Sequence, residues 1–117
     1  MATARARYVV RRLKKYGIVG IVAGRYIEAG YSVELSHKTR LGNIDILVRS
    51  RGEVYAVEVL HRGIYTVDQA KLLQEKAKLV GARPVLILYG RQPRLTAEAL
   101  SYCSSNGIKV RRVPSQK

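Results

Sequence analysis

The chain has 117 residues and a formal net charge of +14 at pH 7, from 22 Lys and Arg against eight Asp and Glu. This length suits one domain with a real core, and an apolar share of 47% argues against disorder over most of the chain. No apolar run approaches the ~18 residues of a membrane-spanning helix, so we expect no membrane association and a polyanion, nucleic acid first, as the partner.

Two helices are predicted at the N-terminus. In ARARYVVRRLKKYG, apolar residues recur at helical spacing between basic ones, which predicts a basic amphipathic helix. A second helix is predicted over residues 18–29, ending before Gly30. Within it, Gly20, Ala23 and Gly24 form a small-residue face that lets another element approach closely. The N-terminal stretch lacks a hydrophobic segment with a cleavage site, so we expect a cytoplasmic, nucleoid-associated protein.

Five strands and two more helices are predicted beyond Gly30. YSVELS, NIDILVRS and VYAVEVLH alternate with period two and predict three short strands, with Arg51 and Gly52 as a tight turn between the last two. TVDQ fits a capping box that starts a helix at Thr66, and the apolar run PVLILYG is typical of a strand covered on both faces. Thr96 then caps a last helix, and IKVRRV predicts a final basic strand.

The predicted order is therefore α-α-β-β-β-α-β-α-β. A helix between the third and fourth strands implies a right-handed crossover, so the fold class is α/β with a mixed central sheet flanked by helices. We expect a single domain over residues 1–117, opening with the basic helix and ending in a short frayed tail, PSQK.

Two acids, Asp45 and Glu58, lie on the predicted hairpin. With Arg51 and Gly52 as the turn residues, counting outward along the antiparallel pair sets Asp45 directly opposite Glu58. Like charges there, with Cβ atoms about 4.5 to 5.5 Å apart, are destabilising unless something positive lies between them. We therefore expect a divalent cation such as Mg²⁺ or a cationic side chain. A register slip of one residue would instead send the acids to opposite faces, each paired with an arginine.

These segments carry a family resemblance. GNIDILV, then VYAVEVL, a helix bearing Gln69 and PVLILYG together resemble the PD-(D/E)xK nuclease superfamily, and within it the archaeal Holliday junction resolvases. The similarity covers roughly residues 17–90 and implies a restriction-endonuclease-like fold. In that family an Asp and a Glu on adjacent strands bind Mg²⁺, a Lys two residues after the Glu helps activate the attacking water, and a Gln or Glu in the next helix assists. The resemblance thus implies metal ligation by Asp45 and Glu58, assistance by Gln69, and a symmetric homodimer acting in DNA recombination or repair.

The chain departs from the family pattern at two places. Leu60 stands where the family has Lys, and GIVGIVAG stands where active members usually offer a Glu. Lys38, in the predicted loop SHKTRLGN, could supply the missing charge, whereas His61 should point to the other face of the sheet by strand alternation. The capping box alone would also explain Gln69 without any chemistry.

Basic residues gather in three places: the first helix, the hairpin with its approaches, and the final strand with Lys109, Arg111 and Arg112. Three such groups with few acids between them predict a surface that tracks phosphates and recognises shape, with an affinity that falls steeply with salt. The expected nucleic-acid contacts are Arg5, Arg7, Arg11, Arg12, Lys14, Lys15, Lys38, Arg40, Arg49, Arg51 and Arg62.

The sequence thus predicts a DNA-binding protein of nuclease-like fold. The first hypothesis is a Mg²⁺-dependent, structure-selective endonuclease of Holliday junction resolvase type, with Asp45, Glu58, Gln69 and Lys38 as catalytic residues. One alternative is an inactive nuclease-fold protein that binds branched or duplex nucleic acid. The other is a basic assembly subunit or RNA-associated factor. The small-residue helix face or PVLILYG would provide the contact of a homodimer.

Overall fold

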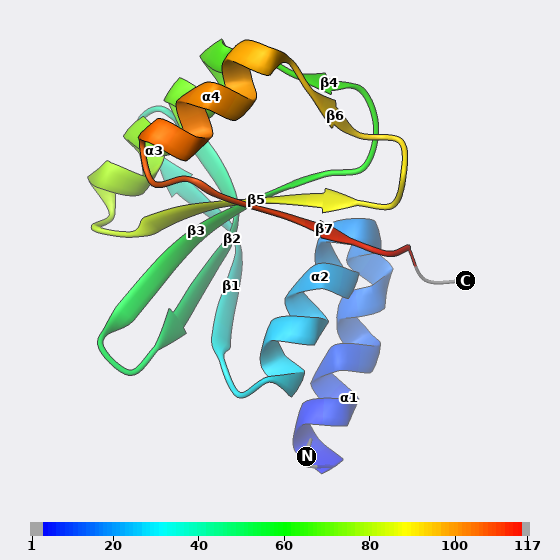
Figure 1. Ribbon diagram of the computed structural model, residues 1–117. Coiled ribbons are helices and arrows are strands. Elements are labelled where there is room, and N and C mark those ends of the chain that lie inside the picture. Colours follow the sequence, from blue (N-terminus) through cyan, green and yellow to red (C-terminus); the bar gives the residue numbers. More distant parts are fainter. Residues whose placement is uncertain (1–3, 116–117) are drawn as a thin grey trace.

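A five-stranded mixed sheet with helices on both faces makes up the computed structural model, which describes residues 4–115 (Figure 1). The spatial order is β1 (Ser32–Thr39), β2 (Gly42–Ser50), β3 (Glu53–Leu60), β5 (Arg83–Tyr89) and β7 (Lys109–Val113). The first three strands pair antiparallel, whereas β3, β5 and β7 pair parallel. The predicted fold class is confirmed.

The helices form one layer on each face of the sheet. On one face lie α1 (Ala4–Leu13), the 3-10 turn η1 (Lys14–Tyr16) and α2 (Gly17–Glu28), and on the other lie α3 (Val67–Leu79) and α4 (Ala97–Ser105) (Figure 1). No helix in the described part of the chain is long and apolar enough to cross a membrane.

Two short strands were not predicted. β4 (Ile64–Tyr65) and β6 (Arg94–Leu95) pair in parallel as a second, two-stranded sheet. Two residues are too few to show a hydrophobic period, so the sequence has no signal for them. β4 lies in the connection from β3 to α3, and β6 lies in the connection from β5 to α4. Their pairing holds these two connections together.

Side-chain caps determine where the two C-terminal helices begin. The Thr66 side chain accepts a hydrogen bond from the Gln69 amide, and the Gln69 side chain accepts one from the Thr66 amide at 2.9 Å. This is the predicted capping box. Thr96 likewise accepts from the Ala99 amide at 3.0 Å, as expected for the last helix.

Apolar residues of the sheet alternate between the two helical layers. Ile46, Val48 and Val57 pack with Val22 and Ala23 of α2. On the opposite face, Leu86 and Leu88 of β5 pack with Leu73 of α3 and Cys103 of α4. Because β5 is covered on both faces, its apolar run needs no alternation with polar residues, as predicted.

The small-residue face of α2 is covered by α1. A Cβ atom added to Gly24 would lie 2.9 Å from Val10 Cγ1, and one added to Gly20 would lie 1.8 Å from the Leu13 carbonyl oxygen. The predicted close approach is confirmed, and its partner is a helix of the same chain. Since β5 is also buried within the sheet, both surfaces suggested for a homodimer are used internally, and the homodimer stays a prediction.

The predicted loop SHKTRLGN is wrong. β1 continues through Thr39, so Lys38 lies on a strand, paired with Asn43, and the turn shrinks to residues 40–41. Thr39 Oγ1 donates to the Gly42 carbonyl at 2.6 Å and accepts from the Leu41 amide at 3.1 Å, and these bonds tighten the turn. Of the predicted tail, residues 114–115 have no regular secondary structure, and residues 116–117 lie outside the described residues.

Candidate functional site

The β2–β3 hairpin has the predicted register. The ladder of paired residues runs from the turn to Ile46 and Val57, and one further step would set Asp45 opposite Glu58. Gly52 has a φ of +69°, the conformation for which glycine suits this turn. The alternative register, slipped by one residue, is wrong.

The ladder between β2 and β1 skips Asp45, and the ladder between β2 and β3 ends one residue before it, at Ile46. On the β1 side, pairing skips Ser36, which has a φ of +53°, and resumes with His37 and Ile44. On the β3 side, Asp45 Oδ2 accepts a hydrogen bond from the Val59 amide at 2.9 Å. A side-chain oxygen thus satisfies the Val59 amide and holds the Asp45 carboxylate beside the strand that carries Glu58.

The Glu58 carboxylate is partly buried and is held by a hydrogen bond from Tyr65 of β4, just before α3. Tyr65, which is fully buried, donates its hydroxyl to Glu58 Oε1 at 2.7 Å, and the Gln69 carbonyl oxygen lies 3.2 Å from the same hydroxyl. Burial raises the pKa of Glu58, the Tyr65 hydrogen bond and the Lys76 charge lower it, and the Asp45 charge raises it. The two acids therefore lie close enough to repel each other where water is partly excluded.

Lys76 of α3 is the cation that the sequence analysis missed. Its Nζ atom donates to the Asn43 carbonyl at 2.8 Å, two residues before Asp45. Gln69, Leu73 and Lys76 are spaced by four and three residues and so share one helix face, which is a signal that the sequence contains. Neither acid makes an ion pair within the described residues, so the alternative in which each acid pairs with an arginine is wrong.

The other predicted site residues lie around this pair. Gln69 is exposed and its side-chain oxygen serves the capping box. Lys38 is exposed on β1. Leu60 packs against the apolar cluster that contains Tyr65, and His61 lines a cavity on the opposite, α2 side, as strand alternation predicted. Catalytic roles for Gln69 and Lys38 stay predictions.

The donor atoms at this point fit a hard divalent cation. Asp45 Oδ1 and Glu58 Oε2 have no hydrogen-bond partner among residues 4–115, while the other oxygen of each carboxylate is held in place. The described residues contain no group of three or more His, Cys, Asp or Glu that would hold a metal ion. Two carboxylates are enough for Mg²⁺, because water and substrate phosphate oxygens commonly complete its shell.

All eleven predicted nucleic-acid contacts are exposed, but the hairpin group divides in two. Arg49 and Arg51 lie at the β2–β3 turn, and Arg49 contacts Glu34 at 3.5 Å. Lys38, Arg40 and Arg62 lie at the other end of β2, about 30 Å away for nine residues of strand. The prediction of one cluster on the hairpin is wrong, because residues near in sequence lie at opposite ends of the strands.

No protein-family model and no curated protein matches the chain. Solved structures do. EndoMS in complex with double-stranded DNA is 18% identical, with a TM-score of 0.63 over 100% of this chain and 48% of that one. A repair endonuclease from Pyrococcus abyssi is 17% identical, with a TM-score of 0.61 over 99% and 49%.

A third structure, a protein of unknown function named AF1548, is 18% identical, with a TM-score of 0.62 over 79% of this chain and 54% of that one. The chain thus spans about half the length of these proteins. At such low identity the likeness shows the fold. The fold is that of the endonuclease structures, and the predicted nuclease-like architecture is confirmed.

Proposed function

We propose that the chain is a Mg²⁺-dependent DNA endonuclease domain of the PD-(D/E)xK type. The observation that carries this proposal is the convergence of Asp45 and Glu58 where both ladders of β2 break, on a fold shared with repair endonucleases. Two like charges in a partly buried site are destabilising. A site that keeps them there, with one free oxygen each among the described residues, is suited to a cation.

Each neighbour of the acid pair has a definable role in this proposal. Asp45 and Glu58 would hold Mg²⁺, which when bound activates a water and neutralises charge on the scissile phosphate. The Val59 amide orients Asp45, and the Tyr65 hydroxyl orients Glu58. Lys76 supplies the positive charge that Leu60 cannot, because it already lowers the pKa of Glu58. Gln69 and Lys38 are proposed as assisting residues.

The proposed substrate is branched or double-stranded DNA. Binding to a phosphate backbone is supported by the net charge of +14 and by the exposed lysines and arginines on α1, on η1 and at the two strand turns. Action on a four-way junction would need a homodimer, because two strands have to be cut symmetrically.

An inactive DNA-binding protein is the second candidate. Leu60 favours it, because this side chain packs with buried apolar residues where the resembled family has a lysine. In that case the acid pair would be a remnant of a catalytic site, and binding would persist without cleavage.

A nicking assay distinguishes these candidates. End-labelled four-way junction and plain duplex are incubated with the wild type, Asp45→Asn or Glu28→Gln, with Mg²⁺ or with a chelator. We expect cleavage by the wild type and by Glu28→Gln, an exposed acid of equal charge, and none by Asp45→Asn or without metal. Binding without cleavage in all three would select the inactive protein. Absent or salt-insensitive binding would favour the basic assembly subunit.

A further inference from the structure

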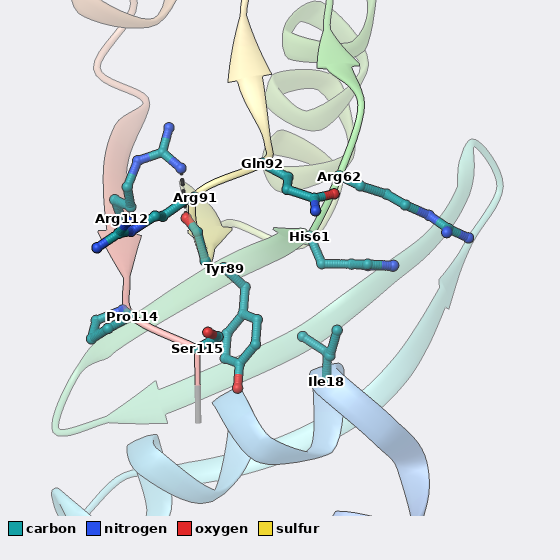
Figure 2. Close-up of a pocket in the computed structure, with 10 residues that line it drawn as sticks. Ile18, His61, Arg62, Tyr89, Arg91, Gln92, Arg112, Pro114 and Ser115 are labelled. Atoms are coloured by element: carbon teal, nitrogen blue, oxygen red, sulfur yellow. Dashed lines mark hydrogen bonds between the residues drawn. The ribbon is translucent and has the colours of Figure 1, made fainter. Parts of the chain in front are cut away.

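A second concave site lies at the carboxyl ends of the three parallel strands. It is a cavity of about 1020 Å³ that is lined by residues at or just after the carboxyl ends of β3, β5 and β7 and by Ile18 at the start of α2 (Figure 2). The carboxyl ends of parallel strands are a common place for ligands in α/β proteins. The cavity is at the upper end of the size of small-molecule pockets, which leaves room for more than a single phosphate ion.

The charges at this cavity all have one sign. His61, Arg62, Arg91 and Arg112 line it, and among the described residues its lining contains no Asp or Glu. In Figure 2 the Arg62 and Arg91 side chains extend to opposite sides, while Tyr89 and Ile18 lie between them. This arrangement is a cationic rim around an apolar floor, and it suits an extended polyanion better than one small anion.

Hydrogen bonds hold the rim in place. Arg112 donates to the Gly90 carbonyl at 2.6 Å and to the Pro93 carbonyl at 2.8 Å, which fixes the segment that carries Arg91. The Arg94 amide donates to the Gly63 carbonyl at 3.0 Å, which joins this segment to the one that carries Arg62. Because the two segments are tied together before any ligand arrives, binding costs less conformational entropy.

We propose that this cavity binds a phosphate-bearing segment of a nucleic acid strand, with Arg62 and Arg91 contacting phosphates on either side of the floor. The inference rests on the proposed DNA binding but not on cleavage. His61 follows Glu58 by three residues, about 10 Å along an extended chain. A strand that leaves the acid pair over the end of β3 therefore reaches the cavity within a few nucleotides. The phosphate belongs either to the interior of the strand or to its terminus, and the experiment separates the two.

The test compares charge removal at the two ends of the sheet. Arg62→Gln/Arg91→Gln removes two charges from the rim and leaves Arg112 in place. Lys78→Gln/Arg83→Gln removes two exposed charges at the opposite end of the sheet, near the end of α3 and at the start of β5. Fluorescence anisotropy measures the affinity of each protein for short single strands with a 5′-phosphate, a 3′-phosphate or neither, over a range of salt concentrations. Thermal melting of each variant checks that it is folded.

The expected result is a selective loss of affinity in the rim variant. Its affinity should fall about tenfold and its salt slope by about 1.4, at roughly 0.7 for each single-strand phosphate that the variant no longer neutralises, while the opposite-end variant changes less than about twofold. Equal weakening on all three strands assigns the arginines to internal phosphates, and weakening only on a phosphorylated strand assigns them to that terminus. Equal affinities of the two variants would overturn the inference while DNA binding stands. A wild type that binds none of the three strands but binds a duplex in the same assay would overturn the inference alone, and one that binds neither would overturn both.

In a complementary measurement, the Arg62 and Arg91 side-chain Nε–Hε signals are followed by NMR. We expect both to shift when the wild type is titrated with a 5′-phosphorylated trinucleotide, with Arg83 as the internal reference. Shifts of Arg83 alone would contradict the proposed site.

Discussion

The acid pair and the basic cavity lie at the same end of β3, yet they handle charge in opposite ways. Asp45 and Glu58 are partly buried, held by a backbone amide and a tyrosine hydroxyl, and their mutual repulsion is only partly offset by Lys76. The lining of the cavity has three arginines and one histidine, and among the described residues it has no Asp or Glu. Asp45 and Glu58 lie where water is partly excluded and electrostatic energies are large. The lysines and arginines lie where solvent screens their mutual repulsion.

Removing Lys76 should impair the site formed by Asp45 and Glu58. In Lys76→Met we expect cleavage to fall by about 10²- to 10³-fold, because the site loses the cation that offsets Asp45 and Glu58 near the reacting phosphate. DNA affinity should change little, since Lys76 is partly buried. Single-turnover cleavage as a function of pH is the measurement. The pKa of Glu58 is lowered by Lys76, so its removal should move the acid limb of the profile to higher pH.

Lys78→Met is the matched control, because Lys78 is exposed near the end of the same helix. Equal rates in Lys76→Met and the wild type would show that the positive charge comes from elsewhere, with Lys38 as the next residue to test.

A second prediction concerns the basic residues, and it tests whether DNA affinity depends on their number or on their position. Arg5→Gln/Arg7→Gln/Arg11→Gln removes three exposed charges from α1 while keeping good helix formers. We expect the salt slope of duplex binding to fall by about 0.9 for each phosphate that is no longer neutralised, with at least about tenfold weaker binding at low salt. Anisotropy titrations across salt concentrations measure this. If Lys71→Gln/Lys78→Gln/Arg83→Gln, three exposed charges outside the predicted contacts, weakens binding equally, net charge alone accounts for affinity and α1 is no interface.

Most of the architecture was readable from the sequence because its signals are local. The capping box at Thr66, the turn at Gly52 and the apolar run of β5 each need only a few neighbouring residues to predict. Strand register followed, since the turn determines how residues are counted outward. β4 and β6 escaped prediction because their pairing depends on two connections brought together by the whole fold.

The candidate site was only half readable for the same reason. Asp45 and Glu58 are linked through one short hairpin, whereas Lys76 reaches Asn43 across 33 positions of the chain. Its helical spacing from Gln69 was visible, but the direction in which that helix face points was not. The division of the basic hairpin residues between two ends of β2 was likewise hidden, because sequence proximity does not show which end of a strand a residue occupies.

Neutralising Glu58 should show that its charged carboxylate lowers the free energy of unfolding. Burial raises the pKa of Glu58, so the folded state binds its proton more tightly than the unfolded chain does. At neutral pH the charged carboxylate therefore destabilises the fold, and this penalty disappears as the pH falls through the raised pKa. Glu58→Gln should raise the free energy of unfolding by about 1 kcal/mol at neutral pH, which is roughly 4 °C in Tm, while abolishing cleavage.

Thermal denaturation at several pH values without added metal tests this expectation. Glu75→Gln, at an exposed position of α3, carries the same change in net charge and should leave Tm nearly constant. A gain in Tm that is equal in both variants, or that grows as the pH falls, would contradict the assigned cause.

The smallest expected effect concerns Ser36, the β1 residue beside Asp45 at which the pairing of β1 with β2 is skipped. Ser36 is the non-glycine residue with positive φ in the described chain, and it lies on β1 where the ladder skips Asp45. Left-handed backbone costs an ordinary residue about 1–2 kcal/mol, and glycine is free of this cost but loses more entropy on folding. Ser36→Gly should therefore raise the free energy of unfolding slightly, by about 0.5 kcal/mol in urea denaturation.

Ser32→Gly on the same strand is the matched control, because Ser32 is also exposed but pairs normally with Arg49. It should lower the free energy of unfolding by about 0.5–1 kcal/mol, as glycine does within a regular strand. Opposite signs in the two variants would show that the break in the sheet is built into the backbone at Ser36, so that the gap holding Asp45 exists before any metal or DNA arrives. Equal decreases would mean that Ser36 is unstrained in solution, and the interruption beside Asp45 would then have to come from the acid pair itself.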